Sequence, residues 1–168
     1  MSALKLLKPN QMVDSIYHID LQQLKQQGIK AIIADLDNTL VPWRSSEVQE
    51  KLVDWINTVR DADLKIAIVS NNTSARVEAM SSQLGVIALG GAIKPRRGAF
   101  RSIAAQFNLY PKEVAVVGDQ LFTDILGGNR TGMHTILVTP MSTHEFIGTK
   151  IVRQIEKVFL RNLNNKST

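Results

Sequence analysis

Acidic residues stand at the ends of two apolar runs in this chain. Asp35 and Asp37 close one run, and Asp119 directly follows another. On an extended segment, residues i and i+2 point to the same side, so Asp35 and Asp37 repel unless a cation lies between them or one keeps its proton. Mg²⁺ prefers such oxygen ligands, together with substrate phosphate. We therefore expect Asp35, Asp37 and Asp119 to bind Mg²⁺, although an Asx turn at Asp37 and Asn38 would use the same residues.

Neutral and basic groups that suit a phosphate follow other apolar runs. Ser70 and Asn71 offer hydroxyl and amide donors for phosphate oxygens, although the same segment could simply cap a helix that begins near Thr73. Lys94 precedes a proline and supplies a point charge for phosphate; alone it would fit a solvated surface lysine. Asp124 fits either a helix cap or a supporting acid, and both readings stay open.

Five short β-branched runs alternate with amphipathic stretches. The runs cover 30–35, 65–70, 86–89, 114–118 and 134–138. They do not alternate with polar residues, which is typical of parallel strands covered on both faces. Helical patterns cover 47–59, 73–84, 98–107 and 151–163, with Ser46 as a predicted N-cap, and a short helix lies between Asp20 and Gly28.

This βαβα order predicts an α/β fold, a three-layer, Rossmann-like, doubly wound parallel sheet. Ligands bind beyond the carboxyl ends of such strands, where the polar residues of this chain collect. The glycines at 127, 128 and 132 predict a tight, irregular segment after the fourth strand. A polar tail at 164–168 is expected to fray.

Size and composition limit the alternatives. A chain of 168 residues predicts a single domain over 1–168, and 44% hydrophobic with 21% charged residues is ordinary globular usage. The absence of cysteine excludes disulfides, thiolate metal sites and a cysteine nucleophile. The net charge of +5 permits an anionic partner. No apolar run reaches the roughly 18 residues of a membrane span, so we expect a cytoplasmic protein without a transmembrane segment.

Read together, these segments resemble the haloacid dehalogenase (HAD) superfamily of phosphohydrolases. The resemblance rests on residues 35–40 for its first motif, Ser70 for its second, Lys94 for its third and 118–124 for its fourth. The wider sequence, including Pro9-Asn10 and 127–129, is similar to the YqeG-like, subclass IIIA branch. That branch is related to mitochondrial phosphatidylglycerophosphate phosphatases.

The resemblance implies a mechanism. Asp35 would attack phosphorus to form an aspartyl-phosphate, and Asp37 would protonate the leaving group and then deprotonate water. Mg²⁺ would be held by Asp35, the Asp37 carbonyl and Asp119. Ser70 and Lys94 would hold the phosphoryl oxygens.

Further roles follow from the same resemblance. Asp124 would bind the metal through water or orient Lys94, and Thr39 would support the ligands from behind. Asn71 would join Ser70 at the phosphate.

Short connections predict that no cap domain covers the site. Residues 41–46 form a brief link to the next helix, and the stretch between Asn72 and Lys94 has room for one helix and one strand. An open site favours a bulky substrate that excludes water itself, either a macromolecule or a lipid head group. Basic residues near the site would suit an anionic membrane surface, to which the protein would bind peripherally. They are Arg44, Arg96, Arg97 and Arg101.

Three functions remain possible from the sequence alone. The first is a Mg²⁺-dependent phosphatase that acts on a phosphorylated substrate such as phosphatidylglycerophosphate. The second is a capless phosphatase of phosphoproteins or nucleic-acid ends; the chain lacks interleaved basic and aromatic residues, which argues against a nucleic-acid partner. The third is a non-catalytic phosphate-binding protein, against which the intact pair of Asp35 and Asp37 speaks.

Overall fold

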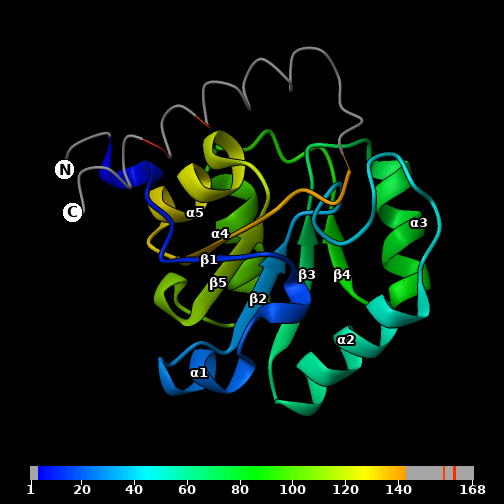
Figure 1. The fold of residues 1–168 in the computed structure, drawn as a ribbon, viewed down its shortest axis with the longest axis horizontal. Coiled ribbons are helices and arrows are strands. Elements are labelled where there is room, and N and C mark those ends of the chain that lie inside the picture. The colour runs from blue at the N-terminus through cyan, green and yellow to red at the C-terminus, as the bar shows by residue number, and fades with distance from the viewer. Residues whose placement is uncertain (1–3, 143–156, 158–160, 162–168) are drawn as a thin grey trace.

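The computed structural model describes residues 4–142, 157 and 161, and in these residues a parallel β-sheet forms the centre of the molecule (Figure 1). Its six strands run in the order β1-β6-β5-β2-β3-β4, and every neighbouring pair is parallel. The strands are β1 (Gln11–Val13), β2 (Ala31–Ala34), β3 (Lys65–Val69), β4 (Ile87–Leu89), β5 (Val114–Gly118) and β6 (His134–Val138). The predicted doubly wound α/β sheet is confirmed.

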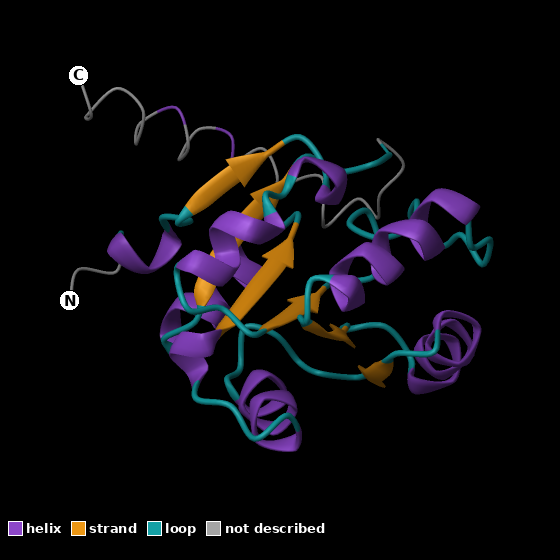
Figure 2. Ribbon diagram, turned by 90° about the horizontal axis from the view of Figure 1, so that it is seen from below, coloured by secondary structure: helices purple, strands orange, loops and turns teal. Residues whose placement is uncertain are grey.

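Helices cover both faces of this sheet (Figure 2). They are α1 (Leu21–Gln26), α2 (Glu50–Asp61), α3 (Ser74–Leu84), α4 (Gly98–Gln106) and α5 (Leu126–Thr131). Short 3₁₀ turns span Lys5–Leu7, Ile16–His18 and Pro111–Glu113, and a π-helical turn spans Leu121–Ile125. Apolar side chains of α1, α2 and α3 pack on one face against Ile32 and Ile68, and those of α4 pack on the other against Ile33 and Val116. Burial on both faces explains why the strands are continuously apolar.

The strands match the sequence prediction closely, although one strand was not predicted. All five predicted runs form strands, with ends that differ by at most one residue from the predicted ones. The missed strand is β1, a three-residue edge strand that pairs with β6, Gln11 opposite Ile136. Its central residue, Met12, is 55% exposed, so no continuous apolar run marks it.

Two local predictions were wrong. Helix α2 begins at Glu50 after Gln49, with no side-chain cap, so Ser46 does not cap it. The glycines at 127 and 128 are helical rather than irregular. A Cβ on Gly127 would lie 2.5 Å from the Phe100 ring, so glycine is needed there for close packing.

Several predicted features concern the ends and connections of the chain. The helix expected at 151–163 and the tail at 164–168 lie outside the described residues, apart from the isolated positions 157 and 161. Residues 35–49 join β2 to α2, and α3 is the one helix between β3 and β4, so neither connection contains a cap domain. In the part of the chain that the structure describes, no helix combines the length and the apolar character needed to cross a membrane.

Candidate active site

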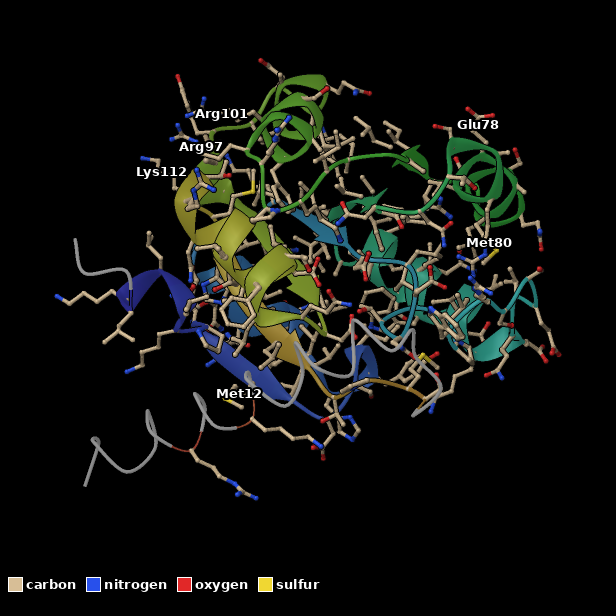
Figure 3. The ribbon with its side chains drawn as sticks, turned by 90° about the horizontal axis from the view of Figure 1, so that it is seen from above. Met12, Glu78, Met80, Arg97, Arg101 and Lys112 are labelled. Carbon is tan, nitrogen blue, oxygen red and sulfur yellow. The ribbon has the colours of Figure 1, made fainter. Side chains whose placement is uncertain are left out.

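The carboxyl ends of three adjacent strands form a small polar cavity. Asp35 follows β2, Ser70 follows β3 and Asp119 follows β5, and β2 lies between the other two strands in the sheet. Figure 3 looks onto this end of the sheet. The cavity has a volume of about 190 Å³. Its lining residues are Asp35, Asp37, Asn38, Trp43, Ser70, Asn71, Asn72, Lys94, Gln120 and Thr123.

Three carboxylates converge at this end of the sheet. Asp35, Asp119 and Asp124 each place one carboxylate oxygen within 4.8 Å of the other two. Strand pairing sets the first position, because the backbone N–H of Asp35 donates to the carbonyl of Val117 in β5 (2.9 Å). Thr39, predicted to support the ligands, donates from its Oγ1 to Asp119 Oδ1 (3.2 Å). This grouping offers hard oxygen ligands to one divalent cation.

Lys94 joins two of these carboxylates. Its Nζ donates to Asp35 Oδ1 (2.7 Å) and to Asp124 Oδ1 (2.5 Å), and its side chain is 2% exposed. The backbone of Lys94 is held by Asn71, whose Oδ1 accepts from the Lys94 N–H (2.6 Å). The amide of Asn71, predicted to bind phosphate, thus lines the cavity while it contacts the Lys94 backbone. Asp124 contacts Lys94, as the predicted role of orienting Lys94 requires.

Burial shifts the pKa values of the charged groups in this cluster. Burial raises the pKa of Asp35 to about 6, although the Lys94 ammonium acts in the opposite direction. Burial also raises the pKa of Asp124. For Lys94, burial lowers the pKa, but the carboxylates of Asp124 and Asp35 outweigh it and the net shift is upward. A divalent cation bound among these carboxylates would add positive charge to that of Lys94.

The carboxylate of Asp37 has a separate set of donors. Its Oδ1 accepts from the backbone N–H of Arg44 (2.9 Å). Its Oδ2 accepts from Asn72 Nδ2 (2.8 Å) and from Arg76 Nη1 (2.7 Å). Asp37 therefore lines the same cavity as Asp35 but stands outside the group of three carboxylates. The ligand that the family resemblance implies at Asp37 is its backbone carbonyl.

A left-handed residue turns the chain at this point. Asn38 has a φ of 61°, and its N–H donates to the carbonyl of Val41 (2.7 Å). Asparagine tolerates this conformation better than most residues, because its short side chain can hydrogen-bond locally. Its Oδ1 accepts from the Ser142 hydroxyl (2.6 Å), which ties the turn to the segment after β6. The turn and the carboxylate pair thus coexist, rather than being alternatives.

Ser70 and Asn72 complete the wall formed by the end of β3. Ser70 is 2% exposed, and its Oγ accepts from the Asn72 N–H (3.1 Å). Asn72 Oδ1 accepts from the Thr73 N–H at the start of α3 (2.8 Å). Helix α3 has Thr73 as its N-cap residue and no side-chain capping hydrogen bond, so the capping interpretation of this segment is wrong.

Sequence reasoning missed Arg76 altogether. It lies on α3, 39 residues from Asp37 in the chain, and meets it only in the folded protein. One signal was present: Arg76 occupies the first turn of a helix, where the helix dipole disfavours a cation.

None of the four predicted basic residues is among the described residues that line the cavity. Arg44 stacks on Trp43, a cavity residue, with its Cζ 4.5 Å from the ring centre. Figure 3 shows Arg97 and Arg101 on the side of α4, across the molecule from Glu78 on α3. Arg96 is the fourth of the predicted basic residues. All four are exposed, and they form no ion pair among the described residues.

Comparisons with known proteins identify the family of this chain. The family model of the mitochondrial PGP phosphatases matches residues 1–142. The chain is 40% identical over 162 residues to "Probable phosphatase YqeG" of Bacillus subtilis, covering 96% of this chain and 94% of that protein. It is 30% identical over 163 residues to phosphatidylglycerophosphate phosphatase 1 of Arabidopsis thaliana, covering 90% of this chain and 46% of that protein.

Solved structures support the fold. A HAD phosphatase of Thermococcus onnurineus superposes with a TM-score of 0.50 at 20% identity, covering 60% of this chain and 51% of that one. The resemblance to the YqeG-like branch is confirmed. The chain belongs to the mitochondrial PGP phosphatase family, within the HAD superfamily, and is a HAD-type phosphatase.

Proposed function

We propose that this phosphatase is a Mg²⁺-dependent phosphomonoester hydrolase that works through an aspartyl-phosphate on Asp35. One observation carries the proposal: Lys94 binds Asp35 and Asp124 inside a buried group of three carboxylates at the end of the sheet. Burying several carboxylates together costs free energy unless a cation neutralises their charge.

In the first half-reaction, an oxygen of Asp35 attacks the phosphorus of the bound ester. The bond between phosphorus and the ester oxygen breaks, and its electron pair stays with the leaving oxygen. Asp37 donates a proton to that oxygen, so the leaving group departs as an alcohol. Lys94 and Ser70 hold the phosphoryl oxygens, whose charge shifts during the transfer.

In the second half-reaction, a water molecule attacks the phosphorus of the aspartyl-phosphate. Asp37 accepts a proton from this water, and the bond between phosphorus and the Asp35 oxygen breaks. Asp35 and Asp37 return to their starting states and inorganic phosphate leaves. The same side chain thus acts first as an acid and then as a base.

The residues present fit a resident Mg²⁺. Asp35, Asp119 and the Asp37 carbonyl would hold it, and Asp124 would hold it directly or through water. When bound, the ion supplies positive charge that stabilises the phosphoryl oxygens and offsets the negative carboxylates. The convergence of Asp35, Asp119 and Asp124 supports this assignment, because each carboxylate offers one oxygen to a single cation.

We infer that the substrate is an anionic phospholipid of the phosphatidylglycerophosphate type. A volume of about 190 Å³ is below the roughly 300 Å³ at which drug-sized pockets begin, so the cavity accepts a phosphoryl group and leaves the rest of the substrate outside. Next to Lys94, the side chain of Ile93 is 60% exposed, and exposed Arg96 and Arg97 follow. An apolar residue beside unpaired cations suits an anionic lipid surface. We infer a peripheral location at such a membrane.

Phosphate release from a panel of esters tests the proposal. The panel contains short-chain phosphatidylglycerophosphate, a sugar phosphate, a nucleotide and a phosphopeptide. We expect release to require Mg²⁺, to stop with a chelator and to be fastest for the lipid. A preference for a soluble ester would remove the lipid assignment and leave the phosphatase in place. Phosphate release that is unaffected by chelation would contradict the proposed dependence on Mg²⁺.

A further inference from the structure

We propose that Arg76 is a positioning residue that holds the carboxylate of Asp37 in the place required for proton transfer. The inference rests on the proposed function, since it deepens the role given there to Asp37. Arg76 belongs to none of the motifs that identify the superfamily in this sequence.

The contacts of Arg76 link three segments of the chain. Its Nη1 donates to Asp37 Oδ2 (2.7 Å) and its Nη2 donates to the carbonyl oxygen of Ser45 (2.7 Å). The neighbouring Arg44 N–H donates to the other oxygen of Asp37, Oδ1 (2.9 Å). One guanidinium on α3 therefore fixes both the carboxylate and the loop that donates to it. The planar fork of arginine reaches two acceptors at once, which a lysine ammonium cannot do with the same geometry.

Stability alone does not explain an arginine at this position. Arg76 lies in the first turn of α3, where the positive end of the helix dipole disfavours a cation. Its Nε is buried and has no hydrogen-bond partner among the described residues. A buried donor without a partner costs free energy, and the ion pair with Asp37 is only partly buried, so it contributes little net stability. These costs are offset if the residue serves the reaction.

The position of Asp37 matters because proton transfer requires its oxygen within hydrogen-bond reach of the leaving group. Asn72 Nδ2 also donates to Oδ2 (2.8 Å), so the same oxygen has two side-chain donors. Without Arg76, one donor to Oδ2 is lost and the loop at Ser45 loses its link to α3. We expect the carboxylate to adopt other rotamers, and a displacement of about 1 Å can cost about 100-fold in rate.

The test compares Arg76→Gln with the wild-type protein on an alkyl and an aryl phosphate. An aryl leaving group needs little proton donation, whereas an alkyl one needs much. We expect kcat on the alkyl ester to fall by ~10- to 100-fold, kcat on the aryl ester to fall far less and KM to change little. Arg76→Lys, which keeps the charge but not the fork, should restore part of the alkyl activity. Arg60→Gln is the matched control, because Arg60 also donates to backbone carbonyls but contacts none of the site residues described above.

A double-mutant cycle with Asp37→Asn decides whether Arg76 acts through Asp37. We expect Arg76→Gln to cost little further activity once Asp37 is already replaced. Fully additive losses would overturn the proposal, and so would a rise in KM at unchanged kcat, which would make Arg76 a substrate contact. If Asp37→Asn itself harms both esters equally, the acid role in the proposed function fails, while the cycle still reports whether the two residues act together.

Discussion

Asp35 carries two opposing requirements at the scale of a single residue. Under the proposed mechanism its carboxylate must be ionised to attack phosphorus, yet burial raises its pKa to about 6 from an ordinary value of 3.8. Lys94 favours the ionised form through its bond to Oδ1, and it is itself held by Asp124. The residue is thus placed for chemistry at the expense of stability, as expected where a metal ion belongs.

The first prediction concerns Asp35→Asn in metal-free protein. A folded-state pKa above the unfolded value means that stability is fully present below pH 3.8 and is lost as pH rises through about 6. At pH 7 the ionised carboxylate costs at most ~3 kcal/mol, from about 1.4 kcal/mol per pKa unit. We therefore expect Asp35→Asn to have a higher Tm than the wild type at pH 7 with a chelator present, and this difference should shrink toward pH 4.

Added Mg²⁺ should reverse the order. The wild-type Tm should rise with the Mg²⁺ concentration, because binding to the folded state alone stabilises it. The Tm of Asp35→Asn should rise much less, because one ligand has lost its charge. Thermal unfolding followed by circular dichroism measures both effects. An Asp35→Asn protein that is less stable than the wild type without metal would contradict the proposed electrostatic strain.

At the scale of elements, the π-helical turn at Leu121–Ile125 brings Asp124 back over the end of β5. Gly118, the last residue of β5, leaves the space that the Asp124 carboxyl group fills: a Cβ at this position would overlap that group. The N–H of Gln120 donates to Asp124 Oδ2 (3.2 Å), which holds the carboxylate from the other side. Gly118 and the π-helical turn therefore fix the position of Asp124, the carboxylate to which Lys94 donates.

The second prediction follows from that close approach. Gly118→Ala should displace the Asp124 carboxylate from Lys94 and destabilise the protein by ~1–3 kcal/mol, the usual cost of overpacking a buried site. It should also weaken Mg²⁺-dependent stabilisation and lower kcat. Denaturant unfolding and phosphate release measure these effects.

Gly98→Ala is the control for this change, because nothing lies within 4 Å of its Cβ position at the start of α4. This variant should keep its activity, with unchanged or slightly raised stability. If Gly118→Ala behaves like Gly98→Ala, the close packing of Asp124 on β5 has no role in the site.

Local patterns predicted most of these elements because their causes are local. Buried parallel strands are apolar throughout, so their ends could be read within one residue. The motifs also placed Asp35, Ser70 and Asp119 directly after strands, and Lys94 in the loop after β4, where the fold brings it to Asp35. Contacts between distant segments could not be read in this way. The bond from Arg76 to Asp37 depends on how α3 packs beside the loop after β2, which no periodicity records.

The chain has a net charge of +5, and among its described residues neither connection that could hold a cap contains one. Under the proposed function, the substrate's own bulk helps to exclude water. Arg96 and Arg97 lie close to Lys94 in sequence, at the start of α4. Under the lipid proposal, this side of the molecule faces the membrane, and remote contacts with the surface contribute to catalysis.

The third prediction tests this orientation with a charge reversal. Arg97→Glu should lower kcat/KM for phosphatidylglycerophosphate in anionic vesicles and leave the hydrolysis of a small aryl phosphate nearly unchanged. The wild-type advantage on vesicles should weaken with salt, since the Debye length falls to about 3 Å at 1 M. The measurement is kcat/KM on vesicles and on the soluble ester, each at low and at high salt.

Lys25→Glu provides the matched control, since it changes the net charge equally on α1, at the other end of the molecule from the strand tips (Figure 1). Equal losses for Arg97→Glu and Lys25→Glu would show a general charge effect rather than a docking face.

Trapping the covalent intermediate tests the central claim most directly. The protein is mixed with excess substrate and Mg²⁺, quenched in acid during turnover, digested and examined by mass spectrometry. We predict one phosphoryl group on the peptide that contains Asp35, absent when a chelator replaces Mg²⁺ and absent in Asp35→Asn. Turnover with a phosphoryl group on another residue, or wild-type turnover by a folded Asp35→Asn protein, would contradict the account.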